Sequence, residues 1–133
     1  MMKVRDVMGR PVILEDEDTS VAIISKDMEL SGIGSVIITK DDETVGIVTD
    51  RDIAIKIVMK NRVPSEVKAK EIMSSPLITI KPEVSLDEAC ELLVENDIRR
   101  LPVIEDDKLV GIISVRNILR RAPDYVHKFY PAE

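Results

Sequence analysis

Two short stretches of the chain carry residues whose types and spacing could do chemistry. In the first, residues 46–52, a glycine, a hydroxyl, a guanidinium and a carboxylate follow one another closely. Gly46 would let a backbone or a ligand approach a strand closely. Thr49 lies where that strand should turn into a helix, so backbone N–H groups favour a phosphate there, to which its hydroxyl can donate. Asp52, one helical turn later, is an acceptor suited to the vicinal hydroxyls of a ribose.

The same spacing has a purely structural interpretation. Thr-x-x-Asp at a helix start is also a capping arrangement, with Thr49 as the cap and Asp52 reaching back to it. The second stretch, residues 111–117, repeats the pattern with Ser114 in place of Thr49 and Asn117 in place of Asp52. An amide still bonds to a sugar hydroxyl, but charge-assisted hydrogen bonds are about twice as strong. We therefore predict two unequal sites, the stronger one at Asp52.

These stretches belong to an internal repeat. Residues 5–53 align with residues 70–118 without a gap, at a constant offset of 65. Each half alone would be marginal, because a chain of about 60 residues buries too little surface. The duplication predicts two copies of one small unit packed into a pseudo-symmetric module, with a cleft between them. We place the first repeat at 1–62, the second at 63–122 and a C-terminal tail at 123–133.

Each half predicts the same order of elements: strand, helix, strand, strand, helix. The class is therefore α+β. The first strands are expected at 12–14 and 77–80, the first helices from Ser20 and Ser85, the hairpin turns at 40–43 and 105–108, the final helices from near Asp50 and Val115, and the linker at 61–68. Ser85 and Glu88 have the capping-box spacing.

The helix expected after Asp50 has an unusually broad apolar surface. Apolar residues cover most of its circumference and leave a narrow polar strip: Ile53, Ala54, Ile55, Ile57, Val58 and Met59 against Lys56 and Lys60. A helix that packs on one sheet needs an apolar stripe of about 100°, and this one is roughly twice as wide. It is buried either deep within the chain or between two copies. We favour the second interpretation, because a small module has little deep interior.

Composition excludes several classes of function. The net charge of −6 argues against general nucleic-acid binding. No apolar run approaches the roughly 20 residues of a membrane span, and the start lacks an apolar signal core, so we expect a cytoplasmic protein that binds no membrane. Cys90 should lie in the core, and no zinc-ligand cluster is visible. All aromatic residues, and the one histidine, His127, lie in the tail.

The order of elements and the doubled motifs resemble a known family. The motifs are the Met-x-x-Pro starts at Met8 and Met73, the Gly-x-x-Thr-x-x-Asp phrase at 46–52 and the segment 98–103. Together they are similar to a pair of cystathionine-β-synthase (CBS) domains, often called a Bateman module. The resemblance covers nearly the whole chain. It implies that the two repeats pack sheet to sheet around a pseudo-twofold axis, leaving two clefts, and that two modules associate as a homodimer.

The resemblance also implies site residues. It assigns phosphate to Thr49 and ribose to Asp52, with Ser114 and Asn117 as their counterparts. For adenine it implies an aliphatic clamp in each cleft, formed by Pro11, Val12, Ile13 and Val48 in one and by Pro76, Leu77 and Ile78 in the other. For phosphate it implies four cations: Arg51, Arg99, Arg100 and Arg116. Arg99 and Arg100 precede the strand that contains Pro102. Guanidinium groups suit phosphate because they offer several donors in a fixed fork.

These implications favour a non-enzymatic regulatory sensor that binds adenosine-containing ligands. AMP, ADP or ATP is the expected ligand, and no cofactor is required. One alternative is a dimerisation or protein-interaction module without ligand sensing, which would hold an unknown protein target. Another is a binder of S-adenosylmethionine or NAD. An enzyme is not expected, because no nucleophile–base pair or metal cluster is evident.

Overall fold

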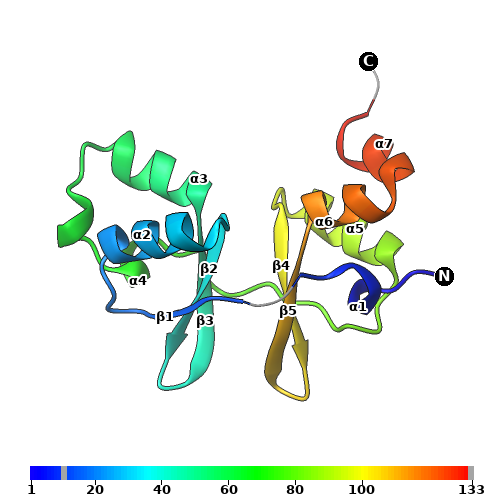
Figure 1. Cartoon of the computed structure of the whole chain (residues 1–133), viewed down its shortest axis with the longest axis horizontal. Coiled ribbons are helices and arrows are strands. Elements are labelled where there is room, and N and C mark those ends of the chain that lie inside the picture. Colours follow the sequence, from blue (N-terminus) through cyan, green and yellow to red (C-terminus); the bar gives the residue numbers. More distant parts are fainter. Residues whose placement is uncertain (10–11, 132–133) are drawn as a thin grey trace. The chain divides into compact units, whose positions relative to one another are not determined.

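The computed structural model describes residues 1–9 and 12–131 and divides the chain into two units. The continuous unit is Ile13–Leu77, and the discontinuous unit combines Met1–Val12 with Ile78–Glu133. Both contain small sheets and helices, which confirms the predicted α+β class (Figure 1). The start of the chain therefore belongs to the unit that holds the second repeat.

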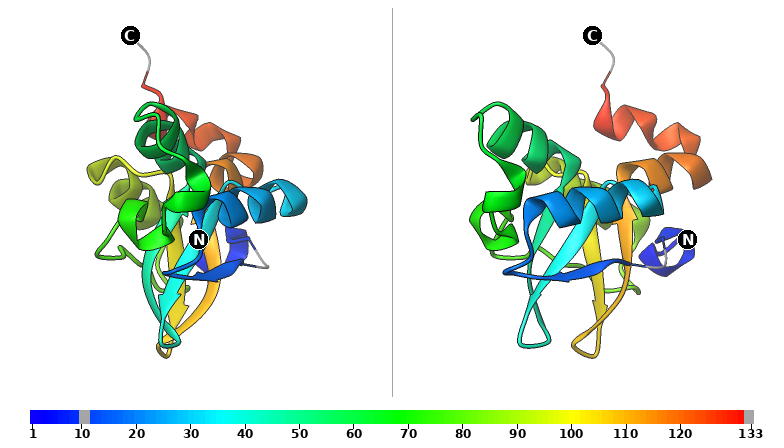
Figure 2. Two further views of the ribbon diagram at one scale, coloured as in Figure 1. Left: turned by 90° about the vertical axis from the view of Figure 1, so that its left-hand side faces the viewer. Right: turned by 60° about the vertical axis from the view of Figure 1, so that its left-hand side comes forward.

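A three-stranded sheet in the order β1-β2-β3 organises the continuous unit. Its elements are β1 (Leu14–Asp16), α2 (Val21–Ser31), β2 (Ser35–Lys40), β3 (Glu43–Thr49), α3 (Asp50–Ile53), the π-helix η1 (Ala54–Val58), the 3₁₀-helix η2 (Pro64–Glu66) and α4 (Ala69–Ile72). Strand β1 runs parallel to β2, and β2 runs antiparallel to β3. Figure 2 shows this unit from two further directions.

Local signals in the sequence set the ends of these elements. Ser20 caps α2 by accepting the backbone N–H of Ile23. Gly32 ends the helix with a φ of 64°, a left-handed conformation that glycine adopts at little cost. Asp41 and Asp42 form the predicted hairpin turn, also with positive φ.

The core of the continuous unit lies between the sheet and its helices. Three apolar residues of α2 recur at helical spacing and are buried, as predicted: Val21, Ile24 and Met28. They pack with buried residues of the strands, the π-helix and α4: Val36, Ile38, Val48, Ile57 and Ile72. The core is therefore aliphatic, since the repeats contain no aromatic residues.

The apolar helix after Asp50 is mostly uncovered within the structure. Ile57 is buried, whereas Val58 is 67% exposed and Met59 is 73% exposed. Ile55 is also exposed. Deep burial within one chain, the first of our two interpretations, is therefore wrong for this face.

The discontinuous unit repeats this plan with an antiparallel sheet of two strands. Its elements are α1 (Val4–Val7), α5 (Leu86–Glu95), β4 (Arg100–Glu105), β5 (Lys108–Ser114), α6 (Val115–Arg121), the 3₁₀-helix η3 (Pro123–Tyr125) and α7 (Val126–Phe129). Val4 and Val7 of α1 pack with Leu86 and Leu93 of α5 in one aliphatic core. The buried Cys90 belongs to this core, as predicted.

The prediction of a strand at 77–80 is wrong: this segment forms only a single parallel bridge, between Ile80 and Val103. In the continuous unit, the N–H of Ile37 donates to the carbonyl of Ile13 at 2.9 Å. The repeat offset places Pro102 opposite Ile37, and proline has no N–H to donate. The second copy therefore loses one of the hydrogen bonds that would extend its ladder.

Each unit takes its methionine–proline segment from the other repeat. Met73 and Ser74 lie on Gly46 of β3, and Ser74 pairs with Ile47. Correspondingly, Met8 and Gly9 lie on Gly111 of β5. The compact units therefore differ from the sequence repeats, while the repeat boundaries 1–62, 63–122 and 123–133 stay predictions about the sequence.

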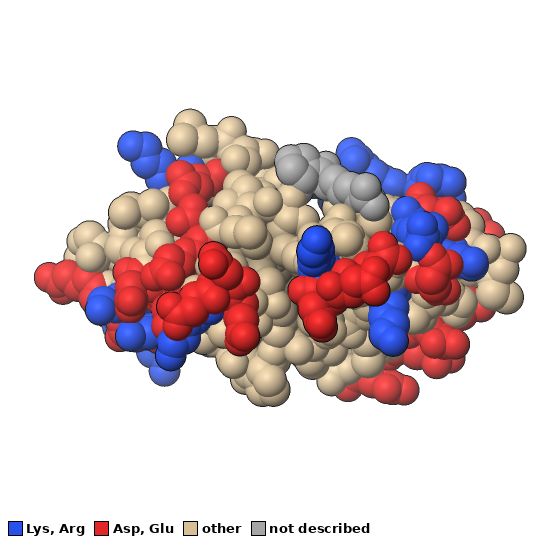
Figure 3. Space-filling model, turned by 90° about the horizontal axis from the view of Figure 1, so that it is seen from below, with Lys and Arg blue, Asp and Glu red and all other residues tan. Residues whose placement is uncertain are grey.

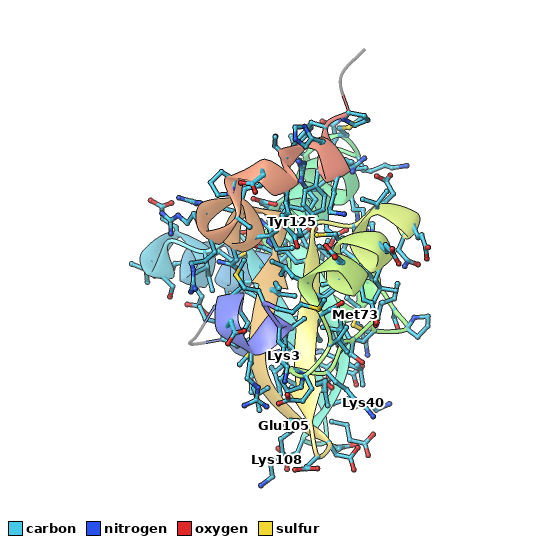
Figure 4. All side chains as sticks on the ribbon, turned by 90° about the vertical axis from the view of Figure 1, so that its right-hand side faces the viewer. Lys3, Lys40, Met73, Glu105, Lys108 and Tyr125 are labelled. Carbon is cyan, nitrogen blue, oxygen red and sulfur yellow. The ribbon has the colours of Figure 1, made fainter. Side chains whose placement is uncertain are left out.

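The tail, which local pattern did not place, packs against the discontinuous unit. Tyr125 and Phe129 contact its core, and Lys128 pairs with Asp87 of α5 at 3.7 Å. Figure 4 shows Tyr125 among the helices, at the opposite end of the strands from Glu105 and Lys108. None of the helices in the described ranges, 1–9 and 12–131, is long and apolar enough to cross a membrane.

Candidate functional site

The Thr49–Asp52 site lies at the end of β3, where the strand becomes α3. Asp52 Oδ2 accepts the Thr49 backbone N–H at 2.9 Å and the Thr49 hydroxyl at 3.1 Å. In return, the Thr49 hydroxyl oxygen accepts the backbone N–H of Asp52 at 3.2 Å. The capping interpretation is therefore confirmed: the two residues form a reciprocal capping box.

This box fixes the carboxylate and leaves little of it uncovered. The Asp52 side chain is 13% exposed. The Thr49 hydroxyl hydrogen points at Asp52, so it must rotate before the hydroxyl can donate to a phosphate. In this arrangement the site offers a ligand the fixed carboxylate of Asp52 as an acceptor, and not the Thr49 hydroxyl as a donor.

Lys56 is the residue that the sequence analysis missed at this site. Its Nζ lies 3.1 Å from Asp52 Oδ1 and donates to the carbonyl of Ile72, the last residue of α4, at 2.7 Å. From the sequence, Lys56 lies only on a narrow polar strip of its helix. The spacing of four residues between Asp52 and Lys56 was a usable signal, because such residues lie on the same face of a helix.

The equivalent site in the discontinuous unit lacks the ion pair. Ser114 and Asn117 form a capping box in which Asn117 Oδ1 accepts the Ser114 N–H at 3.0 Å. The counterpart of Lys56 is Arg121, which donates to the carbonyl of Asp6 at 2.9 Å. Both cations thus reach a carbonyl of a four-residue helix, and Lys56 also meets the carboxylate of Asp52.

Three of the four predicted cations belong to the unit that contains the Ser114 site: Arg99, Arg100 and Arg116. Arg100 is the register partner of Ser114, and the carbonyl of Arg99 accepts the N–H of Val115 at 3.0 Å. The guanidinium of Arg99 donates to the Tyr130 hydroxyl, and its Cζ lies 5.9 Å from the centroid of the Tyr130 ring. The tail therefore contacts Arg99, a residue predicted to bind phosphate. Arg116 is exposed on α6.

In the continuous unit, Arg51 is exposed and its backbone N–H donates to Asp50 Oδ1 at 2.9 Å. The counterpart of Arg99 there is Gly34, whose carbonyl accepts the N–H of Asp50 at 3.0 Å. Gly34 has no side chain to offer a phosphate, so the two sites differ in nearby positive charge.

The residues predicted to clamp adenine are divided between the units. Ile13, Val48 and Leu77 belong to the continuous unit, whereas Val12, Ile78 and Pro102 belong to the discontinuous unit. Val48 and Pro102 are buried, while Val12, Ile13 and Leu77 are half-buried and Ile78 is 36% exposed. Pro11 lies outside the described residues. The adenine assignments therefore stay predictions.

The opposite ends of both hairpins are acidic. The turn of β2–β3 exposes Asp41, Asp42 and Glu43, and the turn of β4–β5 exposes Asp106 and Asp107. Figure 3 views the molecule from the side of these turns and shows many acidic side chains on that face. An anionic ligand is disfavoured at these turns. The described residues include no group of side chains arranged to hold a metal ion.

Comparison with known proteins identifies the repeat. Residues 4–59 and 69–124 each match the CBS domain. An uncharacterized protein of Methanopyrus kandleri is 40% identical over 92% of this chain. The chain spans 63% of the length of that relative.

Two solved structures extend the comparison. The hexameric CBS-CP12 protein from bloom-forming cyanobacteria has a TM-score of 0.87 at 30% identity, over 100% of this chain and 76% of that chain. A CBS domain pair in complex with 5′-methylthioadenosine and S-adenosylmethionine has a TM-score of 0.83 at 26% identity, over 92% of this chain and 97% of that chain. Since the two family matches fall on the two halves of the internal repeat, the chain belongs to the CBS domain family and carries a tandem CBS pair.

Proposed function

We propose that this chain is a non-enzymatic sensor that binds adenosine-containing ligands, with AMP, ADP or ATP preferred, in clefts between its two CBS domains. The observation that carries the proposal is Asp52, an acidic side chain fixed at the end of β3 and 13% exposed. Its oxygens suit ribose hydroxyls, which are hydrogen-bond donors. The solved relative that holds methylthioadenosine and S-adenosylmethionine supports an adenosyl ligand, because adenosine is common to all these molecules.

The two sites are unequal in this proposal. Asp52 offers the ribose a charge-assisted hydrogen bond, whereas Asn117 offers a neutral amide. The Asn117 site has Arg99 and Arg100 close to Ser114, where the Asp52 site has Gly34 and Ser35. We expect the Asp52 site to select for ribose and the Asn117 site to depend more on phosphate.

A homodimer is the second part of the proposal. Val58 and Met59 present an apolar face to solvent, and burying such a face between two copies would be favourable. A ligand would then act by binding the two states of the dimer with different affinities. This face also favours the alternative function, an interaction module whose clefts do no sensing.

A thermal-shift panel tests ligand binding. AMP, ADP, ATP, S-adenosylmethionine and NAD are each added to the native protein. A ligand at ten times its dissociation constant should add about 1.4 kcal/mol of stability, a rise in Tm of about 5 °C. If no compound raises Tm, the sensor proposal fails and the interaction module becomes the better account.

Two reciprocal variants serve as matched controls. Asp52→Asn should keep the capping box, because asparagine already fills that position at Ser114, and should weaken binding at the stronger site. Asn117→Asp should strengthen ribose binding at the other site. If a ligand raises the Tm of both variants and of the native protein by the same amount, the assignment of ribose binding to Asp52 is refuted.

Sedimentation of the native protein tests the dimer separately. A dimer at micromolar concentration is expected. A monomer at high concentration would contradict the role we give to the exposed face of Val58 and Met59.

A further inference from the structure

The acceptor capacity of Asp52 is largely occupied within the folded chain. An ionised carboxylate has about four lone-pair positions on its two oxygens. Two hydrogen bonds from Thr49 reach Oδ2, at 2.9 Å and 3.1 Å. The ammonium of Lys56 reaches Oδ1 at 3.1 Å. Among the described residues no further donor reaches this carboxylate, so one position, on Oδ1, is left for a ligand.

Lys56 is held at the third position, on Oδ1, and leaves the fourth to a ligand. Its ammonium also donates to the Ile72 carbonyl at 2.7 Å, so it is anchored at two points rather than one. Arg121 makes a similar contact, with the carbonyl of Asp6 in α1, although its site has the neutral Asn117 in place of Asp52. The contact with Ile72 therefore keeps Lys56 near Asp52 when a ligand arrives.

We propose that Lys56 is a specificity-determining residue that limits Asp52 to one of the two ribose hydroxyls. This inference rests on the proposed function, in which Asp52 binds the ribose. It follows that a nucleotide needs only one of its two hydroxyls at this site, and that removal of the other is tolerated.

The test compares three nucleotides: AMP, 2′-deoxy-AMP and 3′-deoxy-AMP. Titration calorimetry gives the affinity of each for the tighter site. On the native protein, one deoxy nucleotide should bind about tenfold more weakly than AMP, and the other should bind within about twofold of AMP.

Substitution of Lys56 should change this pattern. Lys56→Met opens the second position on Oδ1, so both deoxy nucleotides should bind several-fold more weakly than AMP. Lys56→Arg restores the donor and should return the native pattern. Lys60→Met is the matched control: it removes an exposed lysine four residues later and should leave the pattern unchanged. Circular dichroism and Tm confirm that each variant is folded, and a purely structural role for Lys56 would scale all three affinities together.

The outcomes separate this inference from the proposed function. If AMP does not bind, or if Asp52→Asn leaves AMP affinity unchanged, the ribose role of Asp52 fails and this inference fails with it. If Asp52→Asn weakens AMP binding, but both deoxy nucleotides bind the native protein equally less tightly than AMP, only the specificity role of Lys56 is overturned. An unchanged pattern in Lys56→Met overturns it in the same way.

Discussion

Replacing Gly46 by alanine should destabilise the continuous unit, because another segment occupies the space above this glycine. A Cβ on Gly46 would lie 2.6 Å from Met73 Sδ and 2.9 Å from the Ser74 carbonyl oxygen. The thioether can rotate away. The carbonyl cannot move as easily, since it accepts the Ile47 N–H at 3.2 Å while the Ser74 N–H donates to the Ile47 carbonyl at 2.9 Å. Alanine must therefore push the paired backbone outwards.

Overpacking of this kind costs about 1–3 kcal/mol. Alanine also lowers the conformational entropy of the unfolded chain, which stabilises the folded state by about 0.5–1 kcal/mol. We therefore expect Gly46→Ala to lower the free energy of unfolding by about 1 kcal/mol, measured by urea denaturation followed by circular dichroism.

Two further glycines provide a graded control. A Cβ on Gly111 would lie 2.8 Å from Met8 Sδ and 3.0 Å from the Gly9 carbonyl oxygen, so Gly111→Ala should cost less. A Cβ on Gly9 would meet nothing closer than 3.7 Å, so Gly9→Ala should be near neutral. If Gly46→Ala loses no more stability than Gly9→Ala, the segment at Met73 does not pack on β3 as described.

Three other predictions concern single side chains. Burial, a hydrogen bond with Asp27 and the negative charge of Asp27 raise the pKa of Glu15 from 4.5 to about 7. The folded protein then holds a proton that the unfolded chain has released, so stability should fall by about 1–2 kcal/mol as pH rises from about 4.5 to about 7. Glu15→Gln should remove this fall in urea unfolding, and an unchanged fall would refute the assignment. Burial raises the pKa of the Cys90 thiol to about 11, so a thiol reagent at pH 8 should label it slowly until urea unfolds the protein. Met59→Glu should change monomer stability by less than about 0.5 kcal/mol, since Met59 is 73% exposed, but should abolish the dimer in sedimentation; a persisting dimer would place the interface elsewhere.

Local features of the fold could be predicted because local chemistry decides them. The acidic hairpin turns, the serine caps of α2 and α5 and the buried stripes of both helices follow from turn preference, capping and helical spacing. The position of Thr49 at the strand–helix junction also followed, together with its capping bond to Asp52. These features depend on residues that are close in the sequence.

The features that were missed depend on distant residues. Nothing near Gly46 indicates that Met73 will lie on it, because the contact joins two repeats. The second copy lacks one hydrogen bond of its first ladder because of Pro102, which lies more than 20 residues from Ile80 along the chain. Lys56 lay at a suggestive spacing from Asp52, but its second contact, with the carbonyl of Ile72, could not be read from that spacing.

A crystal structure of the protein grown with AMP would show whether Asp52 binds the ribose. We expect a ribose hydroxyl at a hydrogen-bond distance of about 2.5–3.0 Å from Asp52 Oδ1, with Lys56 still bound to the same oxygen. Density for AMP away from Asp52, or none at saturating AMP, would rule out this role of Asp52.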